Sequence, residues 1–199
     1  ATLDTYRAQA PGKVEGIGPA LGWNHSGWPA WRQYAPVVAP FIHHRRPIRA
    51  ANLPRDRIRP LARKGFSALG AARAATLGLD RPFPAEMLAD MAAEQVDAHC
   101  GQIPAARAAP FARIQIARDA MMAGALLGAA KGGKAVLVAG SGHVRRDRGV
   151  PYQLERRGVR TTMLVLAAIE VREKDLQPES YGANYDYLWF TPRQQRDDP

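Results

Sequence analysis

The sequence predicts an α/β fold in which a sheet with a parallel core is flanked by helices, with a small helical subdomain. Continuous apolar runs of strand length occur at residues 134–139 and 161–169, and such runs are typical of strands covered on both faces. Helical patterns separate these runs from each other and from shorter strand candidates at 47–52 and 185–190. This alternation of strands and helices favours a parallel arrangement.

The first half of the chain is expected to begin with a loop-rich segment, because glycine and proline punctuate residues 1–30. A helix should run from Pro29 to about His44, although Pro36 and Pro40 predict a kink or a break in it. The strand at 47–52 ends on Asn52, and α/β sheets bind their ligands where such strands end. Asn52 is therefore a candidate binding residue.

Helices are expected over most of the remaining chain. Short helices should occupy 55–80, and longer ones 84–99 and 106–131, the last of them stopped by Gly132 and Gly133. A further short helix is predicted at 149–157, with Pro151 in its first turn. The domain organisation that follows is an N-terminal segment at 1–30, an α/β domain at 31–192 with a helical insertion at about 55–105, and a polar tail at 193–199.

Composition narrows the classes of function. The 199 residues are 46% hydrophobic and 23% charged, which indicates a folded chain that is neither disordered nor embedded in a membrane. The net charge of +10 predicts a basic surface suited to an anionic small ligand or to peripheral contact with a lipid surface. The arginines are scattered and nucleic-acid-binding motifs are absent, so nucleic acid is not expected as a partner. The single cysteine, Cys100, excludes an internal disulfide and a cysteine-rich zinc site.

Two features carry candidate chemistry. The turn at Gly140-Ser-Gly142 follows the predicted strand at 134–139 directly, which places His143 at the carboxyl edge of the sheet, where it could ligate a metal, donate to an anion or act as a general base. A structural histidine that caps the strand is the alternative. Asp119 shares a face of the long helix with packing residues, so its carboxylate needs a partner, and His143 or a nearby arginine is the candidate. A surface ion pair is the alternative for Asp119.

Six segments of the chain, taken together, resemble the ChaN-like family of haem-binding, iron-regulated bacterial lipoproteins, in the wider superfamily of Tiki, TraB and erythromycin esterase. They are Trp28-x-x-Trp31-x-x-Tyr34, Ala50-Ala-Asn-Leu-Pro-Arg55, His99-Cys-Gly-x-x-Pro104, Gln115-x-x-Arg118-Asp-Ala-Met121, Gly140-Ser-Gly-His-Val-Arg-Arg-Asp-x-Gly-Val-Pro151 and Tyr187-Leu-Trp-Phe-Thr-Pro192. The family's opening Gly-Glu-x-His strand and the glutamate of its second strand do not occur here. The first family strands are therefore expected to be missing from the sheet, and hydrolytic activity is not expected of this sequence.

The resemblance implies haem as the cofactor, often bound at a dimer interface. It also implies a role in haem or iron uptake or handling, in the periplasm or a membrane-associated part of the cell envelope. Haem needs an axial ligand, for which the chain offers His143, Tyr152 and His99, and cations for its propionates, for which it offers Arg145 and Arg55. His143 is also the candidate metal ligand.

Two other functions stay open from the sequence. A metal-dependent hydrolase of the Tiki or erythromycin esterase type is suggested by His143 and Asp119 together with the superfamily resemblance. A homodimer, or a non-catalytic subunit of a larger membrane-associated assembly, is suggested by the missing strands, whose neighbours would need another cover. The tryptophan- and proline-rich first 30 residues could wrap such a neighbour.

Overall fold

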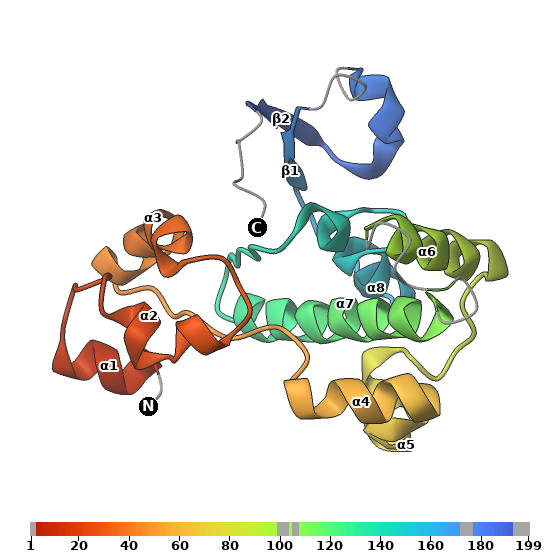
Figure 1. Ribbon diagram of the computed structural model, residues 1–199, viewed down its shortest axis with the longest axis horizontal. Helices are drawn as coiled ribbons and strands as arrows, with labels where there is room; N and C mark the ends of the chain where they lie inside the picture. The colour runs from red at the N-terminus through yellow and green to blue at the C-terminus, as the bar shows by residue number, and fades with distance from the viewer. Residues whose placement is uncertain (1–2, 99–103, 105–107, 172–176, 193–199) are drawn as a thin grey trace. The chain divides into compact units, whose positions relative to one another are not determined.

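The computed structural model describes residues 3–98, 104, 108–171 and 177–192. The chain divides into two compact units, residues 1–50 and 51–199, which are described separately. Figure 1 labels the elements along the chain. The proposed boundary at residue 30 and the other domain limits stay predictions.

The first unit is helical. It contains α1 (Leu3–Gln9), α2 (Ile17–Ala20), the 3₁₀ turn η1 (Trp23–His25) and α3 (Trp31–His43). Its core is formed by Val14, Ile17 and Ile42. A Cβ on Gly18 would lie 2.5 Å from Cγ of Trp31, so glycine is needed there to let the indole approach the backbone. The indole in turn donates a 3.0 Å hydrogen bond to the carbonyl of Val14.

The predicted helix from Pro29 to about His44 is confirmed, whereas a break in it and the strand at 47–52 were wrong predictions. Helix α3 continues through Pro36 and Pro40 without a break, although each proline lacks the amide donor of a helix interior. Packing explains the continuity, because Trp31 near one end and Ile42 near the other both join the core of the unit. The expected strand at 47–52 is absent, and the segment has no regular secondary structure.

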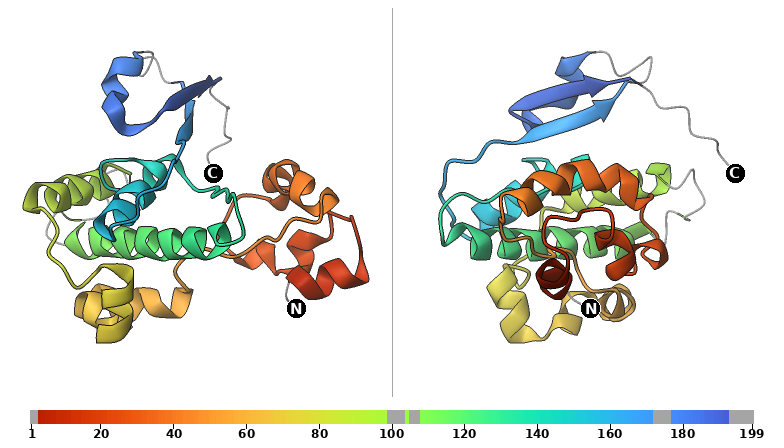
Figure 2. Two further views of the ribbon diagram at one scale, coloured as in Figure 1. Left: turned by 180° about the vertical axis from the view of Figure 1, so that it is seen from behind. Right: turned by 90° about the vertical axis from the view of Figure 1, so that its left-hand side faces the viewer.

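Helix α7 (Ala108–Ala130) is the centre of the second unit. The helices α4 (Arg55–Lys64) and α5 (Ala71–Leu77), with the 3₁₀ turn η2 (Gly65–Leu69), lie on one side of it, and α6 (Ala85–Ala98) and α8 (Val150–Arg156) on the other (Figures 1 and 2). All of these helices fall where the sequence predicts them, within a few residues. Helix α7 is apolar nearly all round, as expected of a helix covered by several neighbours.

The buried side chains form two clusters along α7. One contains Leu61, Leu77 and Ile116, and the other contains Met122 and Leu154, on α7 and α8. The clusters succeed each other along α7, and Asp119 lies close in sequence to the change from one cluster to the other.

The sheet consists of two parallel strands, β1 (Leu166–Glu170) and β2 (Tyr187–Thr191), in the described part of the chain. Leu166 pairs with Tyr187 and Ala168 with Trp189. The 3₁₀ segment η6 (Pro178–Asn184) lies in their connection. The parallel pairing confirms the predicted α/β class in a helix-rich form.

The prediction that residues 134–139 form a strand of the sheet was wrong. Its residues are irregular by hydrogen bonding, and no described backbone group pairs with them as a strand would. Leu137 and Ala139 pack against the cluster around α8, whereas Val136 and Val138 are 71% and 63% exposed. Alternate side chains thus face the cluster and solvent as in a strand, but no described strand pairs with the segment, because a hydrophobic pattern does not determine pairing.

No helix among the described residues is both long enough and apolar enough to span a bilayer.

Candidate functional site

A buried carboxylate and an imidazole form the centre of the site. Asp119 lies on α7 with 2% of its surface exposed, and His143 lies in the 3₁₀ turn η4 (Ser141–Val144). The imidazole Nδ1 is 2.5 Å from the Asp119 Oδ1. This contact confirms that the partner of Asp119 is His143, one of the two partners that the sequence suggests.

Burial dominates the electrostatics of Asp119. It raises the pKa of this carboxyl from 3.8 to about 6, against the hydrogen bond and charge of His143 and the smaller effects of Arg118 and Arg148. The ionised carboxylate can accept a hydrogen bond from Nδ1–H, and in the tautomer that donates this bond the lone pair of a neutral imidazole lies on Nε2. Nε2 has no hydrogen-bond partner among the described residues, and 15% of the His143 side chain is exposed. Asp119 thus orients the imidazole through Nδ1, and no described residue occupies Nε2.

Close backbone contacts hold η4 in place. The amide of His143 donates to the carbonyl of Gly140 at 2.9 Å, and the amide of Gly149 donates to the carbonyl of Arg145 at 2.9 Å. A Cβ on Gly149 would lie 2.4 Å from the His143 carbonyl oxygen. Glycine at 149 therefore lets the chain fold back over the histidine before α8 begins.

The arginines that follow His143 are paired with carboxylates. Arg145 binds Asp147 through two hydrogen bonds, of 2.9 and 2.6 Å. Its charge and hydrogen bond hold the pKa of Asp147 below the usual value, although burial alone would raise it. A haem propionate at Arg145 would therefore have to share this guanidinium with Asp147.

The next two arginines join the loop to other elements. Arg146 binds Asp186 at 2.6 Å, ahead of β2, and Arg148 binds Glu94 on α6. Their role is structural: they attach the histidine loop to the sheet and to a helix. The sequence shows the arginines, but their acidic partners 40 and 54 positions away carry no local signal.

Sequence reasoning missed Tyr185 at this site. Its hydroxyl donates a 3.3 Å hydrogen bond to the carbonyl of Ser141, in the turn that carries His143. Burial raises the pKa of Tyr185, which keeps the phenol protonated. The only hint in the sequence is its place just before the motif at 187–192.

The other candidate residues lie elsewhere or outside the described residues. Tyr152 on α8 packs against Phe83, with ring centroids 6.5 Å apart. Asn52 accepts a 2.7 Å hydrogen bond from the amide of Leu53, and Arg55 is the exposed first residue of α4. His99 lies outside the described residues. The binding roles proposed for these four residues, as for His143, Asp119 and Arg145, stay predictions.

The described side chains do not form a metal site of their own. Within the described ranges, no group of three or more histidine, cysteine, aspartate or glutamate side chains is placed to share a metal ion. The arrangement at His143 offers one imidazole, which Asp119 holds through Nδ1. Such a ligand suits a metal that already carries its other ligands in a prosthetic group.

Comparison with known proteins identifies the family of the chain. The family model described as "Haem-binding uptake, Tiki superfamily, ChaN" matches residues 1–154, which include Asp119, His143 and Tyr152. No curated protein and no solved structure gives a significant match. The chain therefore belongs to the ChaN haem-binding uptake family of the Tiki superfamily.

Proposed function

We propose that this protein binds haem through Nε2 of His143 and serves in haem uptake or handling at the bacterial cell envelope. The observation that carries the proposal is the 2.5 Å contact between Asp119 and His143. A carboxylate on one ring nitrogen fixes the tautomer and makes the other nitrogen a better ligand for iron. The family contributes the identity of the group, a haem, and the envelope location follows from an uptake role.

The residues present fit a haem in their chemistry. His143 offers its second ring nitrogen as a ligand atom on a side chain that is 15% exposed, and iron in haem binds one or two imidazole ligands. Bound haem would supply its iron, and the protein would supply the orientation of the imidazole and a cation for a propionate. Arg145 is the candidate cation because 24% of its side chain is exposed.

Two tyrosines are weaker candidates for the axial ligand. Tyrosine binds iron as the phenolate, and burial raises the pKa of Tyr185, so that its phenol resists ionisation. Tyr152 packs beside Phe83 and Arg156, whose guanidinium carbon lies 5.8 Å from the Tyr152 ring centroid. Both contacts assign Tyr152 a packing role in α8.

Titration with hemin, followed by the Soret band, tests the proposal. The wild-type protein should give a saturable shift, which His143→Ala should weaken at least tenfold, as loss of a ligand does. His44→Ala removes an exposed histidine of the first unit and is the matched control. Tyr152→Phe should bind as the wild type does. A His143→Ala variant with unchanged Soret position and affinity would refute the assignment.

A role as a subunit of an assembly is the second candidate, favoured by the exposure of Val136 and Val138 in a segment whose backbone pairs with no strand among the described residues. A strand from another chain could pair there and cover these side chains. Sedimentation velocity should then show a dimer or larger species, and Val138→Lys should dissociate it. A monodisperse monomer over a wide concentration range, with and without hemin, would exclude self-association.

A further inference from the structure

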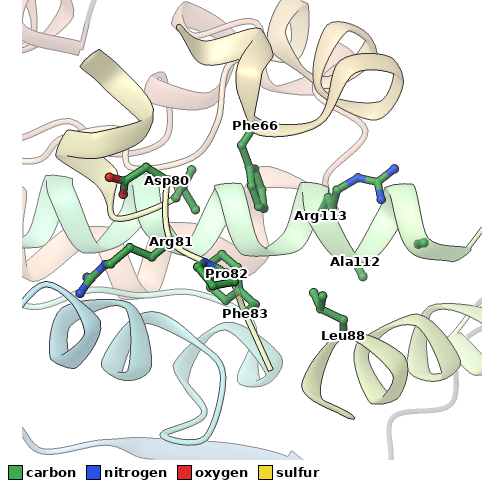
Figure 3. Close-up of a pocket in the computed structure, with 10 residues that line it drawn as sticks. Phe66, Asp80, Arg81, Pro82, Phe83, Leu88, Ala112 and Arg113 are labelled. Carbon is green, nitrogen blue, oxygen red and sulfur yellow. The ribbon is translucent and has the colours of Figure 1, made fainter. Parts of the chain in front are cut away.

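A cavity of about 530 Å³ lies in the second unit, away from the Asp119–His143 pair. It is formed where η2, the segment at 79–83, α6 and the first turns of α7 meet. Figure 3 shows Phe66, Phe83, Leu88 and Ala112 gathered around it. This volume is within the range of roughly 300–1,000 Å³ that small-molecule sites occupy.

The charged residues of the cavity lie at opposite ends. Figure 3 shows the charged ends of Asp80 and Arg81 turned away from the aromatic side chains on one side, and Arg113 extending on the other. Arg81 already donates a hydrogen bond to the carbonyl of Arg156. Arg113 is different, because no hydrogen bond or ion pair joins its side chain to a described residue. A guanidinium without an acceptor at the edge of a cavity is suited to an acceptor that comes from a ligand.

The wall of the cavity is held in shape from α8. Arg156 donates to the carbonyls of Gly78, Arg81 and Pro82 at 3.3, 3.0 and 3.1 Å, and its guanidinium carbon lies 4.0 Å from the centroid of the Phe83 ring. These contacts fix the segment at 79–83 before any ligand arrives. A site that is already formed loses less entropy on binding.

From these observations we infer that the cavity binds an apolar carboxylate, with its hydrocarbon body against Phe66, Phe83 and Leu88 and its carboxylate at Arg113. The walls offer few polar groups, so a ligand body with hydroxyls or amides would lose hydrogen bonds on entry. An anion is favoured over a neutral group because the free donor belongs to a guanidinium. The Asp80 carboxylate lies at the other end and does not oppose the charge.

This inference does not depend on haem binding. Arg113 and Asp119 are six positions apart on α7, which in a helix separates them by about 9 Å along the axis and by about 120° around it. The two sites can therefore be altered one at a time. The failure of one would leave the other standing.

Calorimetric titration of the full chain with octanoate, nonanoate and decanoate, below their micellar concentrations, tests the inference. Affinity should increase about fourfold with each methylene, the gain expected for burying one such group. Decan-1-ol should bind about tenfold more weakly than decanoate, and decyltrimethylammonium more weakly still, because only a carboxylate satisfies Arg113. Equal affinity for the three head groups, or no dependence on chain length, would overturn the inference.

Variants locate the binding. Arg113→Gln should lower the affinity for decanoate to that for decan-1-ol and leave decan-1-ol within twofold of the wild type. Arg81→Gln is the matched control and should keep the preference for the carboxylate. Leu88→Trp, on the partly exposed face of α6, should block all the ligands by filling the cavity, with folding checked by circular dichroism. Unchanged decanoate binding in both Arg113→Gln and Leu88→Trp, or its loss in His143→Ala, would place the ligand elsewhere and refute the site.

Discussion

Two stretches of helix α7 treat charge in opposite ways. Near its middle, Asp119 is buried and its carboxylate meets His143 inside the protein. Near its start, Arg113 borders an apolar cavity and keeps a buried donor without a partner among the described residues. The burial of a charged group therefore does not by itself indicate a binding role. The location of its partner does: the partner of Asp119 is inside the protein, whereas the partner inferred for Arg113 comes from a ligand.

The largest expected change in the free energy of unfolding comes from a second carboxylate placed on α7 without a partner. Ala117 is fully buried, so Ala117→Asp should lower the free energy of unfolding by about 3–5 kcal/mol, the cost of an uncompensated buried charge. Ala129→Asp, on the exposed last turn, should cost no more than about 1 kcal/mol. Urea denaturation measures both. Equal costs would mean that burial does not penalise a carboxylate on α7. The contact with His143 would then not be needed to explain why Asp119 is tolerated.

The pH dependence of stability probes the internal pair. The pKa of Asp119 is raised to about 6 in the folded protein, so between pH 4 and 6 the folded state holds a proton that the unfolded state has lost. Stability from this group is therefore complete below pH 4 and is lost as pH rises through 6. Relative to Asp119→Asn, the free energy of unfolding of the wild type should fall by up to about 3 kcal/mol across this range. Chemical denaturation at several pH values measures it, and a wild type that gains stability over Asp119→Asn as the pH rises would contradict the prediction.

Loss of the contacts that shape the cavity should have the next largest effect on stability. Arg156→Ala removes three hydrogen bonds to carbonyls and the contact with the Phe83 ring, and should lower the free energy of unfolding by about 2 kcal/mol. Arg156→Lys should recover only part of this loss, because an ammonium cannot reproduce the planar fork. Thermal unfolding followed by circular dichroism measures both. A neutral Arg156→Ala substitution would mean that the segment at 79–83 is held by other contacts.

The sequence predicted the helices of the second unit and both strands of the sheet, since β1 and β2 overlap the candidates at 161–169 and 185–190. It also predicted strands at 47–52 and 134–139 that do not form, for a physical reason. The ends of α6, α7 and α8 follow from local signals such as Gly132 and Pro151. The pairing of Asp119 with His143 was also within reach, because a carboxylate on a packing face needs a nearby partner. Strand pairing is not local: the run at 134–139 has the apolar pattern of a strand, but Val136 and Val138 stay exposed without a neighbour. The contact of Tyr185 with Ser141 was likewise invisible, since it joins residues 44 positions apart.

The smallest expected effect concerns Arg113 itself. Because its Nε makes no hydrogen bond with a described residue, Arg113→Gln should change the free energy of unfolding by less than about 0.5 kcal/mol. Arg148 on the polar side is buried and bound to Glu94, so Arg148→Gln should cost about 1–2 kcal/mol. Urea denaturation of both variants makes the comparison. An Arg113→Gln variant that loses as much as Arg148→Gln would show that Arg113 is a structural residue.

The most direct measurement of the central claim is the hemin affinity of Asp119→Asn and His143→Ala beside the wild type, read from the Soret band at pH 7.5. We predict a loss of at least tenfold for His143→Ala and a smaller loss for Asp119→Asn, which keeps the ligand but weakens its orientation. Arg113→Gln should bind hemin as the wild type does. If Asp119→Asn and His143→Ala both bound hemin with the affinity and the Soret position of the wild-type complex, this would contradict the claim that Asp119 orients His143 as the haem ligand.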